Sequence, residues 1–233
     1  ARWLASGLAA ATENRVRLQE PRGTVWNGSA QLVLTGGEGS RDAMALPERL
    51  GWQIRPGLTG ASVALQAQCC MPQPWRLDLQ PRWTGARVLL ADGSSRWPAS
   101  MLTGLGTPWN TVQPEGTLTL STRGLTVEWL SGRMLVDGRL VLEANDLSSR
   151  LTTLKPMGSY RLTLAGTAGD APVSLQLETL SGSLTLTGSG QWVGSRLRFD
   201  GVASAAPDRV DALSNLLNIL GRRDGTRAIM KLG

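Results

Sequence analysis

Side chains that could do chemistry are sparse in this sequence and scattered along it. The chain has no His, so it lacks the commonest general base and metal ligand, and no Ser-His or Cys-His pair can form. Ser94-Ser95 and Ser148-Ser149 have turn-like sequences without a partner base, and no GxSxG or GxGxxG motif is present. The carboxylates stand singly, although such groups can meet in space: Asp78, Asp92, Glu115, Glu128, Asp137 and Glu143. We expect no catalytic residue, metal site or cofactor, and therefore no enzyme.

The only two cysteines are adjacent, at Cys69 and Cys70. Neither a CxxC redox motif nor a zinc ligand set can be built from them. Two alternatives remain open: a vicinal disulfide in an oxidising compartment, or two semi-buried thiols.

The charge balance is basic, with 24 Lys and Arg against 18 Asp and Glu, a net charge of +6. A basic balance can indicate nucleic acid or an anionic membrane surface as a partner. Here Arg carries almost all of it, the only lysines being Lys155 and Lys231, and the only adjacent pair is Arg222-Arg223. Because no basic stripe or known reader motif occurs, we expect no nucleic-acid binding.

Tryptophan is the unusual aromatic residue, with nine Trp beside a single Tyr160 and a single Phe199. In GTVWNG, Gly23 and Gly28 bracket a strand entry, and Trp26 is predicted to be a buried plug that closes the sheet. The other strand tryptophans are expected in the core or at its rim: Trp52, Trp75, Trp129 and Trp192. Trp97 and Trp109 flank a short helix, and the two tryptophans either hold this helix against the sheet or contact a partner.

Alternation of apolar and polar residues predicts most of the secondary structure. The clearest strands lie in segments 116–121, 139–144, 160–166, 173–179 and 183–190, and less regular ones cover the first half. Turns are expected at Asp137-Gly138, Gly169-Asp170 and Ser181-Gly182. Helices are predicted over 2–12, 98–106 and 207–221. In the last, Val210, Leu213, Leu217 and Leu220 share one face, Gly221 suits the C′ position and Arg222-Arg223 suit the negative end of the dipole.

These elements predict an all-β protein. A sheet with one Leu-rich face must curl or be covered, and the helices are too few to cover it. We expect a strongly curved antiparallel sheet, a half-barrel or partly open barrel, with one or two short helices at its ends. Residues 1–233 are taken as a single domain with pseudo-halves at 1–110 and 111–233. The apolar segment Leu4–Ala11 is too short to cross a bilayer.

Several blocks, in order, resemble the type II secretion system protein N family. They are GTVWNGSAQL, WPASMLTGLGTPWNTVQPEGTLTLS, SSRLTTLKPMGSYRLTLAG, LSGSLTLTGSGQW and RLRFDGVASAAPDRVDALSNLLNILGRRDG. Segment 36–60 and the Cys69-Cys70 region match least. The residues taken as a structural signature are Gly23, Thr24, Trp26, Gly28, Gly106, Pro108, Trp109, Gly116, Gly158, Tyr160, Phe199, Gly201, Leu213, Leu216, Leu217 and Gly221.

The resemblance implies a periplasmic domain, held at the Gram-negative inner membrane by a helix upstream of this chain. Its partners are expected among the secretin and the inner-membrane platform proteins, with Trp97, Trp109, Arg222 and Arg223 as contacts. The family is more distantly similar to AsmA-like proteins, whose curved sheets can hold lipid. Two functions therefore stand side by side: docking within the export machine, or binding of a lipid or another hydrophobe in the curve of the sheet.

Overall fold

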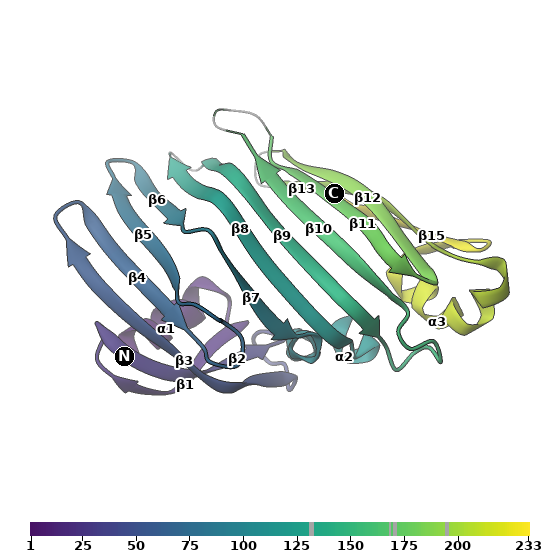
Figure 1. Ribbon diagram of the computed structural model, residues 1–233, viewed down its shortest axis with the longest axis horizontal. Helices are drawn as coiled ribbons and strands as arrows, with labels where there is room; N and C mark the ends of the chain where they lie inside the picture. Colours follow the sequence, from purple (N-terminus) through teal and green to yellow (C-terminus); the bar gives the residue numbers. More distant parts are fainter. Residues whose placement is uncertain (131–132, 168, 170–171, 194–195) are drawn as a thin grey trace.

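The computed structural model describes residues 1–130, 133–167, 169, 172–193 and 196–233, which form one antiparallel sheet with short helices (Figure 1). Its strands in the first half are β1 Val16–Gly23, β2 Asn27–Thr35, β3 Ala43–Gly57, β4 Gly60–Gln66, β5 Trp75–Arg82, β6 Gly85–Leu90 and β7 Gly93–Pro98. Those in the second half are β8 Glu115–Leu130, β9 Arg133–Ser148, β10 Gly158–Gly166, β11 Ser174–Gly182, β12 Leu184–Val193, β13 Arg196–Ala205, β14 Arg222–Asp224 and β15 Arg227–Leu232.

Strands adjacent in sequence are mostly adjacent in space. The order runs β1 to β6, then β8 to β13, β15 and β14, while β7 pairs with β8 beside β6. The two end strands do not meet, so the sheet is open, and β1, β2 and α1 (Arg2–Ala11) curl behind it in Figure 1. The prediction of an open, curled all-β sheet is confirmed.

The predicted alternation sets the two faces. Leu120, Leu142, Leu162 and Leu177 face one another in register across β8, β9, β10 and β11 and form a row on the inner face. Residues one position along form the outer face, where Glu143, Arg161 and Glu178 are neighbours. The apolar face is the inside of the curl because its side chains, unlike the charged ones, gain free energy on leaving water.

Three separate hydrophobic clusters form the core. The N-terminal cluster gathers Leu46, Ala67, Cys70, Met71 and Met101, under the 3-10 helix η1 (Ala99–Leu105). The central cluster is Leu125, Val136 and Val173. The C-terminal cluster packs α3 (Val210–Leu220) onto β12, β13 and β15, and contains Val112, Met157, Tyr160, Leu184, Ala203, Ala205, Leu213, Leu216, Leu217 and Ala228.

Some local predictions were wrong. Asp137-Gly138 is not a turn: β9 continues through it, and Gly138 takes φ +92° opposite a bulge in β8. Strands β7, β13 and β14 were not predicted. The third helix starts as a separate 3-10 turn, η2 (Pro207–Arg209), before α3. Ser181 and Gly182 are the last two residues of β11, and Ser183 alone lies between β11 and β12, whereas Asp170 lies outside the described residues.

Candidate functional site

The prediction that Trp26 is a buried plug is wrong. Trp26 lies in the turn between β1 and β2 and is 55% exposed. The turn itself is where the glycines placed it, since Gly23 ends β1 at φ +80° and Thr24 Oγ1 accepts from the Asn27 N–H (3.0 Å). Trp26 contributes backbone instead, because its carbonyl accepts from the Ile54 N–H (2.7 Å).

Trp52 on β3 is the plug. It is 5% exposed, and its indole Nε1 donates to the Val25 carbonyl at 3.0 Å. The ring lies against Gly28, where an added Cβ would come within 2.6 Å of Trp52 Cζ2. Gly28, the second glycine of GTVWNG, therefore leaves space for an aromatic ring from the next strand.

The second signature block, Gly106, Pro108 and Trp109, joins η1 to the short helix α2 (Trp109–Val112). Gly106 ends η1 at φ +77°, and Pro108 precedes α2. Trp109 is 38% exposed and stays available to a partner. Trp97 is half-buried: it packs on the N-terminal cluster and donates from Nε1 to Ser95 Oγ (2.7 Å). The contacts of the Trp97 side chain are therefore made within the chain.

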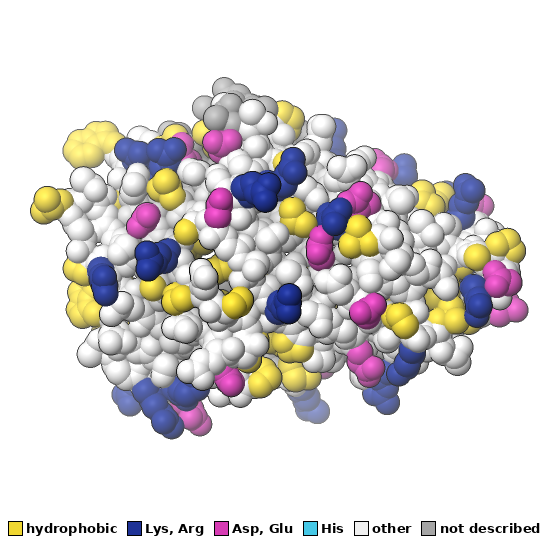
Figure 2. Space-filling model, viewed as in Figure 1, with side chains coloured by type: hydrophobic (Ala, Val, Ile, Leu, Met, Phe, Trp, Pro, Cys, Tyr) yellow, Lys and Arg dark blue, Asp and Glu magenta, His cyan; other side chains and the backbone are white. Residues whose placement is uncertain are grey.

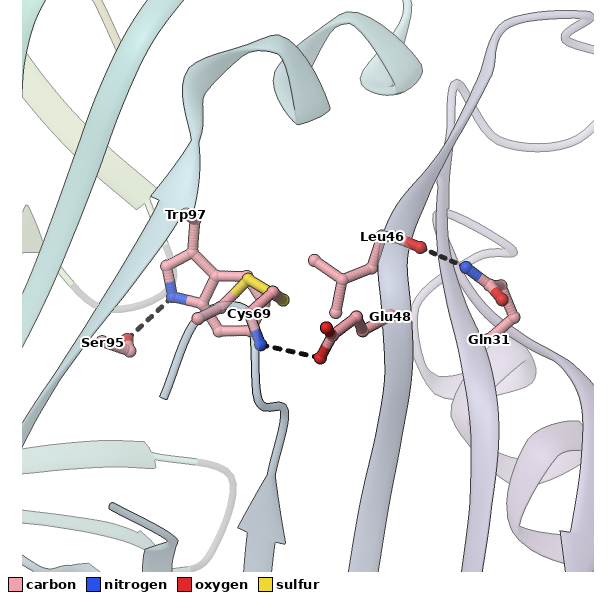
Figure 3. Close-up of a disulfide and its surroundings, with 7 residues drawn as sticks. Gln31, Leu46, Glu48, Cys69, Ser95 and Trp97 are labelled. Carbon is pink, nitrogen blue, oxygen red and sulfur yellow. Dashed lines mark hydrogen bonds between the residues drawn. A yellow bond between two sulfur atoms is a disulfide. The ribbon is translucent and has the colours of Figure 1, made fainter. Parts of the chain in front are cut away.

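Cys69 and Cys70 are joined by a disulfide, with an S–S distance of 2.14 Å. Figure 3 shows their loop between β3, which carries Leu46 and Glu48, and β7, which carries Trp97. The Cys69 N–H donates to Glu48 Oε2 (2.8 Å), and the Cys70 carbonyl accepts from the Arg96 N–H (2.7 Å). The loop therefore bridges the two strands where β4 and β5 do not reach between them.

Gly158 and Tyr160 lie at a close crossing of β10 and β11. Tyr160 is 4% exposed, donates its hydroxyl to the Leu184 carbonyl (3.0 Å) and lies against Gly158. Burial raises the pKa of Tyr160, because the tyrosinate would lose its hydration. Gly116, in β8, takes φ +131° at a register shift opposite Asn145 and Asp146.

Phe199 and Gly201 form another contact between an aromatic ring and glycine. Phe199 is 8% exposed, and added Cβ atoms at Gly188 and Gly201 would lie 2.4 and 2.8 Å from its ring. Gly201 lies on the same strand as Phe199 and Gly188 on the neighbouring β12, and a ring that covers glycines in this way restores the packing that a missing side chain removes. These residues thus have a packing role on the inner face.

Helix α3 buries Leu213 and Leu217 of its predicted face, together with Leu216, at 0–1% exposure, while Val210 and Leu220 are half-buried. Gly221 follows at φ 178°, so it is not the left-handed C′ residue expected. A side chain there would meet the Ile229 carbonyl at 2.2 Å, and this close approach is what requires glycine. Arg222 and Arg223 belong to β14, and Arg223 Nη1 donates to the Ser214 carbonyl (3.4 Å).

The two ends of the sheet differ in what they offer a partner. At β1, Thr12 Oγ1 bonds both backbone groups of Val16 (3.1 and 3.2 Å), and Glu20 at φ +47° with Pro21 breaks the strand. Such features make an edge strand less able to pair with a strand of another molecule. At the other end, β14 pairs only with Arg227–Ile229 of β15, so residues 230–232 pair on the β13 side alone within the described chain.

The outer face is polar and carries ion pairs (Figure 2). Arg161 contacts Glu143 (2.8 Å) and Glu178 (3.0 Å), and hydrogen bonds to these carboxylates raise the pKa of Arg161. Arg123 and Arg139 lie directly opposite each other beside this trio, and neither has an ion pair among the described residues.

Two further features bear on function. Among the described residues, no group of three or more His, Cys, Asp or Glu side chains could hold a metal ion. Within that same part of the chain, every helix is too short or too polar to span a bilayer.

Comparison with known proteins identifies the family. The family model described as type II secretion system (T2SS), protein N, matches residues 14–230, nearly the whole chain. A search of curated proteins and one of solved structures found no match. The chain belongs to the type II secretion system protein N family.

Proposed function

We propose that this chain is an accessory domain of type II secretion that docks on other components of the machine and helps it to assemble. The family gives the role in secretion. Docking would take place on the periplasmic side of the inner membrane, against the secretin or the platform proteins. The observation that supports it is the C-terminal edge of the sheet, where β14 leaves half of β15 uncovered.

The backbone of this edge is suited to strand addition. Asp224 and Arg227 close a two-residue hairpin loop, so they exchange backbone hydrogen bonds, and alternation turns the N–H and C=O of Ile229 and Lys231 to the same side. Ile229 meets Arg222 there, whereas Lys231 has no strand opposite it among the described residues. A partner strand would continue the line of β14 and pair with Lys231.

Side chains around this edge supply anchors. Leu232 is 60% exposed, Ile219 on α3 is 38% exposed and Val202 on β13 is 36% exposed. Arg222, also exposed, adds positive charge at the margin. Exposed apolar residues beside unpaired backbone groups are what a docking strand needs for affinity and side-chain specificity.

A pull-down tests the proposal. The chain is incubated at micromolar concentration with periplasmic domains of the secretin and with the platform proteins. Lys231→Pro removes the outward N–H and should abolish retention, whereas Lys231→Ala keeps the backbone and should retain the partner. Circular dichroism checks that both variants fold. Retention of no component, or equal retention of both variants, would count against docking at this edge.

A second candidate is supported by the inner face of β3 to β6. Ile54, Val63, Leu77 and Leu90 face one another in register, and all are only half-buried. An apolar surface of this kind could take an acyl chain. Native mass spectrometry would reveal a co-purified lipid, and the absence of both lipid and uptake of an apolar fluorophore would eliminate this candidate.

A further inference from the structure

Large apolar side chains stand in water at one end of the sheet. Leu58, between β3 and β4, is 107% exposed, and Trp83, between β5 and β6, is 104% exposed. Leu79, Trp129 and Met134 beside them are 39–45% exposed. We call these five residues the hairpin rim. Figure 1 places the two hairpin tips side by side, and Figure 2 shows apolar side chains standing out at that corner, the upper left.

The fold does not require these side chains. Two-residue hairpin loops favour Gly, Asn and Asp, yet the loops read Leu58-Thr59 and Trp83-Thr84, each followed by glycine. The glycines do have packing reasons: a Cβ at Gly60 would lie 2.0 Å from the Leu79 carbonyl, and one at Gly85 would lie 1.6 Å from that of Trp129. Leu58 and Trp83 are fully exposed, so no described residue covers them. Only a contact from outside the described chain could bury these two side chains.

The two hairpin segments themselves carry charge of one sign. Segments 55–62 and 80–87 contain Arg55, Arg82 and Arg87 and no Asp or Glu. Arg87 is paired with Glu128 (2.8 Å), but among the described residues Arg55 and Arg82 contact only the side chains of Gln53 (3.1 Å) and Gln80 (3.4 Å). Two exposed arginines thus lie within three residues of the protruding Leu and Trp. The hollow between the tips is lined by Leu58, Leu79, Pro81 and Arg82 among others.

We propose that the hairpin rim inserts into the headgroup region of an anionic membrane. Leu58 and Trp83 would enter the interface, where Trp is favoured because its apolar ring and polar N–H match the two sides. Arg55 and Arg82 would meet lipid phosphates. A protein partner would need deep pockets shaped for two protrusions, as binding hot spots require, whereas a bilayer accepts them without such complementarity.

Vesicle flotation of the 233-residue chain tests this. Vesicles of phosphatidylethanolamine and phosphatidylglycerol should carry the protein upward, and neutral phosphatidylcholine vesicles should carry much less. Leu58→Ser and Trp83→Ser should each weaken binding by about tenfold or more, since each side chain loses its apolar burial. Arg55→Gln with Arg82→Gln should weaken binding to the anionic vesicles only. Trp3→Ser is the matched control, because Trp3 is 84% exposed but belongs to α1.

Thermal unfolding and pull-down measurements distinguish a loss of membrane binding from misfolding and from a loss of docking. Since Leu58 and Trp83 contact little of the fold, their variants should unfold at the wild-type temperature, which removes misfolding as an explanation. No flotation with anionic vesicles, or a loss with Trp3→Ser equal to that with Trp83→Ser, would overturn the proposal. Pull-down of secretion components by a rim variant is expected to be normal, so failure here and failure of docking at β15 are independent results.

Discussion

Tryptophan 26 and tryptophan 52 show how a single residue's neighbours decide its role. Both occur in apolar, strand-like sequence, and Trp26 has the more conspicuous setting between two glycines. The buried tryptophan is nevertheless Trp52, because Gly28 leaves space for its ring and the Val25 carbonyl accepts a hydrogen bond from its indole N–H. The same pairing of aromatic ring and glycine recurs with Tyr160 on Gly158 and with Phe199 on Gly188. Tyr160 and Gly158 lie on one strand, whereas the contacts of Trp52 with Gly28 and of Phe199 with Gly188 depend on strand register.

Trp52→Ala should therefore lower the free energy of unfolding by about 3–5 kcal/mol, since it removes a large buried side chain and leaves a cavity. Trp26→Ala should change it by no more than about 0.5 kcal/mol, as for other exposed positions. Urea unfolding followed by circular dichroism measures both. If the two variants were equally destabilised, Trp26 would have a core role that its exposure does not suggest.

From the burial of Tyr160 we predict that the free energy of unfolding decreases in alkaline solution. Its burial raises its pKa above the usual value, so the folded chain keeps the proton in a range where the unfolded chain releases it. This contribution is complete below about pH 10 and falls as the pH rises above that, by up to about 1.4 kcal/mol per pH unit. The urea midpoint should drop between pH 9 and 11, and less so in Tyr160→Phe.

The comparison isolates one group, because Tyr160 is the only tyrosine and the two variants differ at no other residue. Ultraviolet absorbance follows the same group directly. Tyrosinate should form only as the chain unfolds, and its formation in the folded chain near pH 10 would contradict the prediction.

At the scale of elements, alternation located most of the strands, because a face that packs on a core must be apolar at every second residue. It could not locate β7, whose sequence GSSRWP has no such face; Ser95 is buried and Arg96 is exposed. Nor could it separate a bulge from a turn at Asp137-Gly138, since both need positive φ. The exposed rim and the uncovered half of β15 depend on strand lengths and register, which composition does not encode.

Register also brings Arg123 on β8 opposite Arg139 on β9, where like charges destabilise a sheet. Arg123→Glu should convert this repulsion into a cross-strand ion pair and raise stability by about 0.2–1 kcal/mol. Arg123→Gln, which removes repulsion without adding attraction, should lie between the two in thermal unfolding at low salt, and high salt should narrow the differences. If Arg123→Glu were less stable than wild type, the two arginines would not interact as their register indicates.

For the whole molecule, the sheet behaves as a nearly one-dimensional array. Each strand contacts chiefly its neighbours, and the N-terminal, central and C-terminal clusters share no residue. In such arrays stability is a sum of local terms and neighbour interfaces, so one end can open while the other stays closed. The long strands β8 and β9 connect the first and second halves of the chain.

Leu217→Ala tests this organisation, because Leu217, on the buried face of α3, is fully buried in the C-terminal cluster. It should cost about 2–5 kcal/mol locally and speed amide hydrogen exchange in β12, β13 and β15 while β1 to β4 keep their protection. Leu46→Ala, equally buried in the N-terminal cluster, is the matched variant and should give the opposite pattern. Exchange that rose evenly over all strands in both variants would mean that β8 and β9 couple the two ends into one cooperative unit. Exchange confined to one end would mean that a partner at β15 and a membrane at the hairpin rim act on separately stable parts of the sheet.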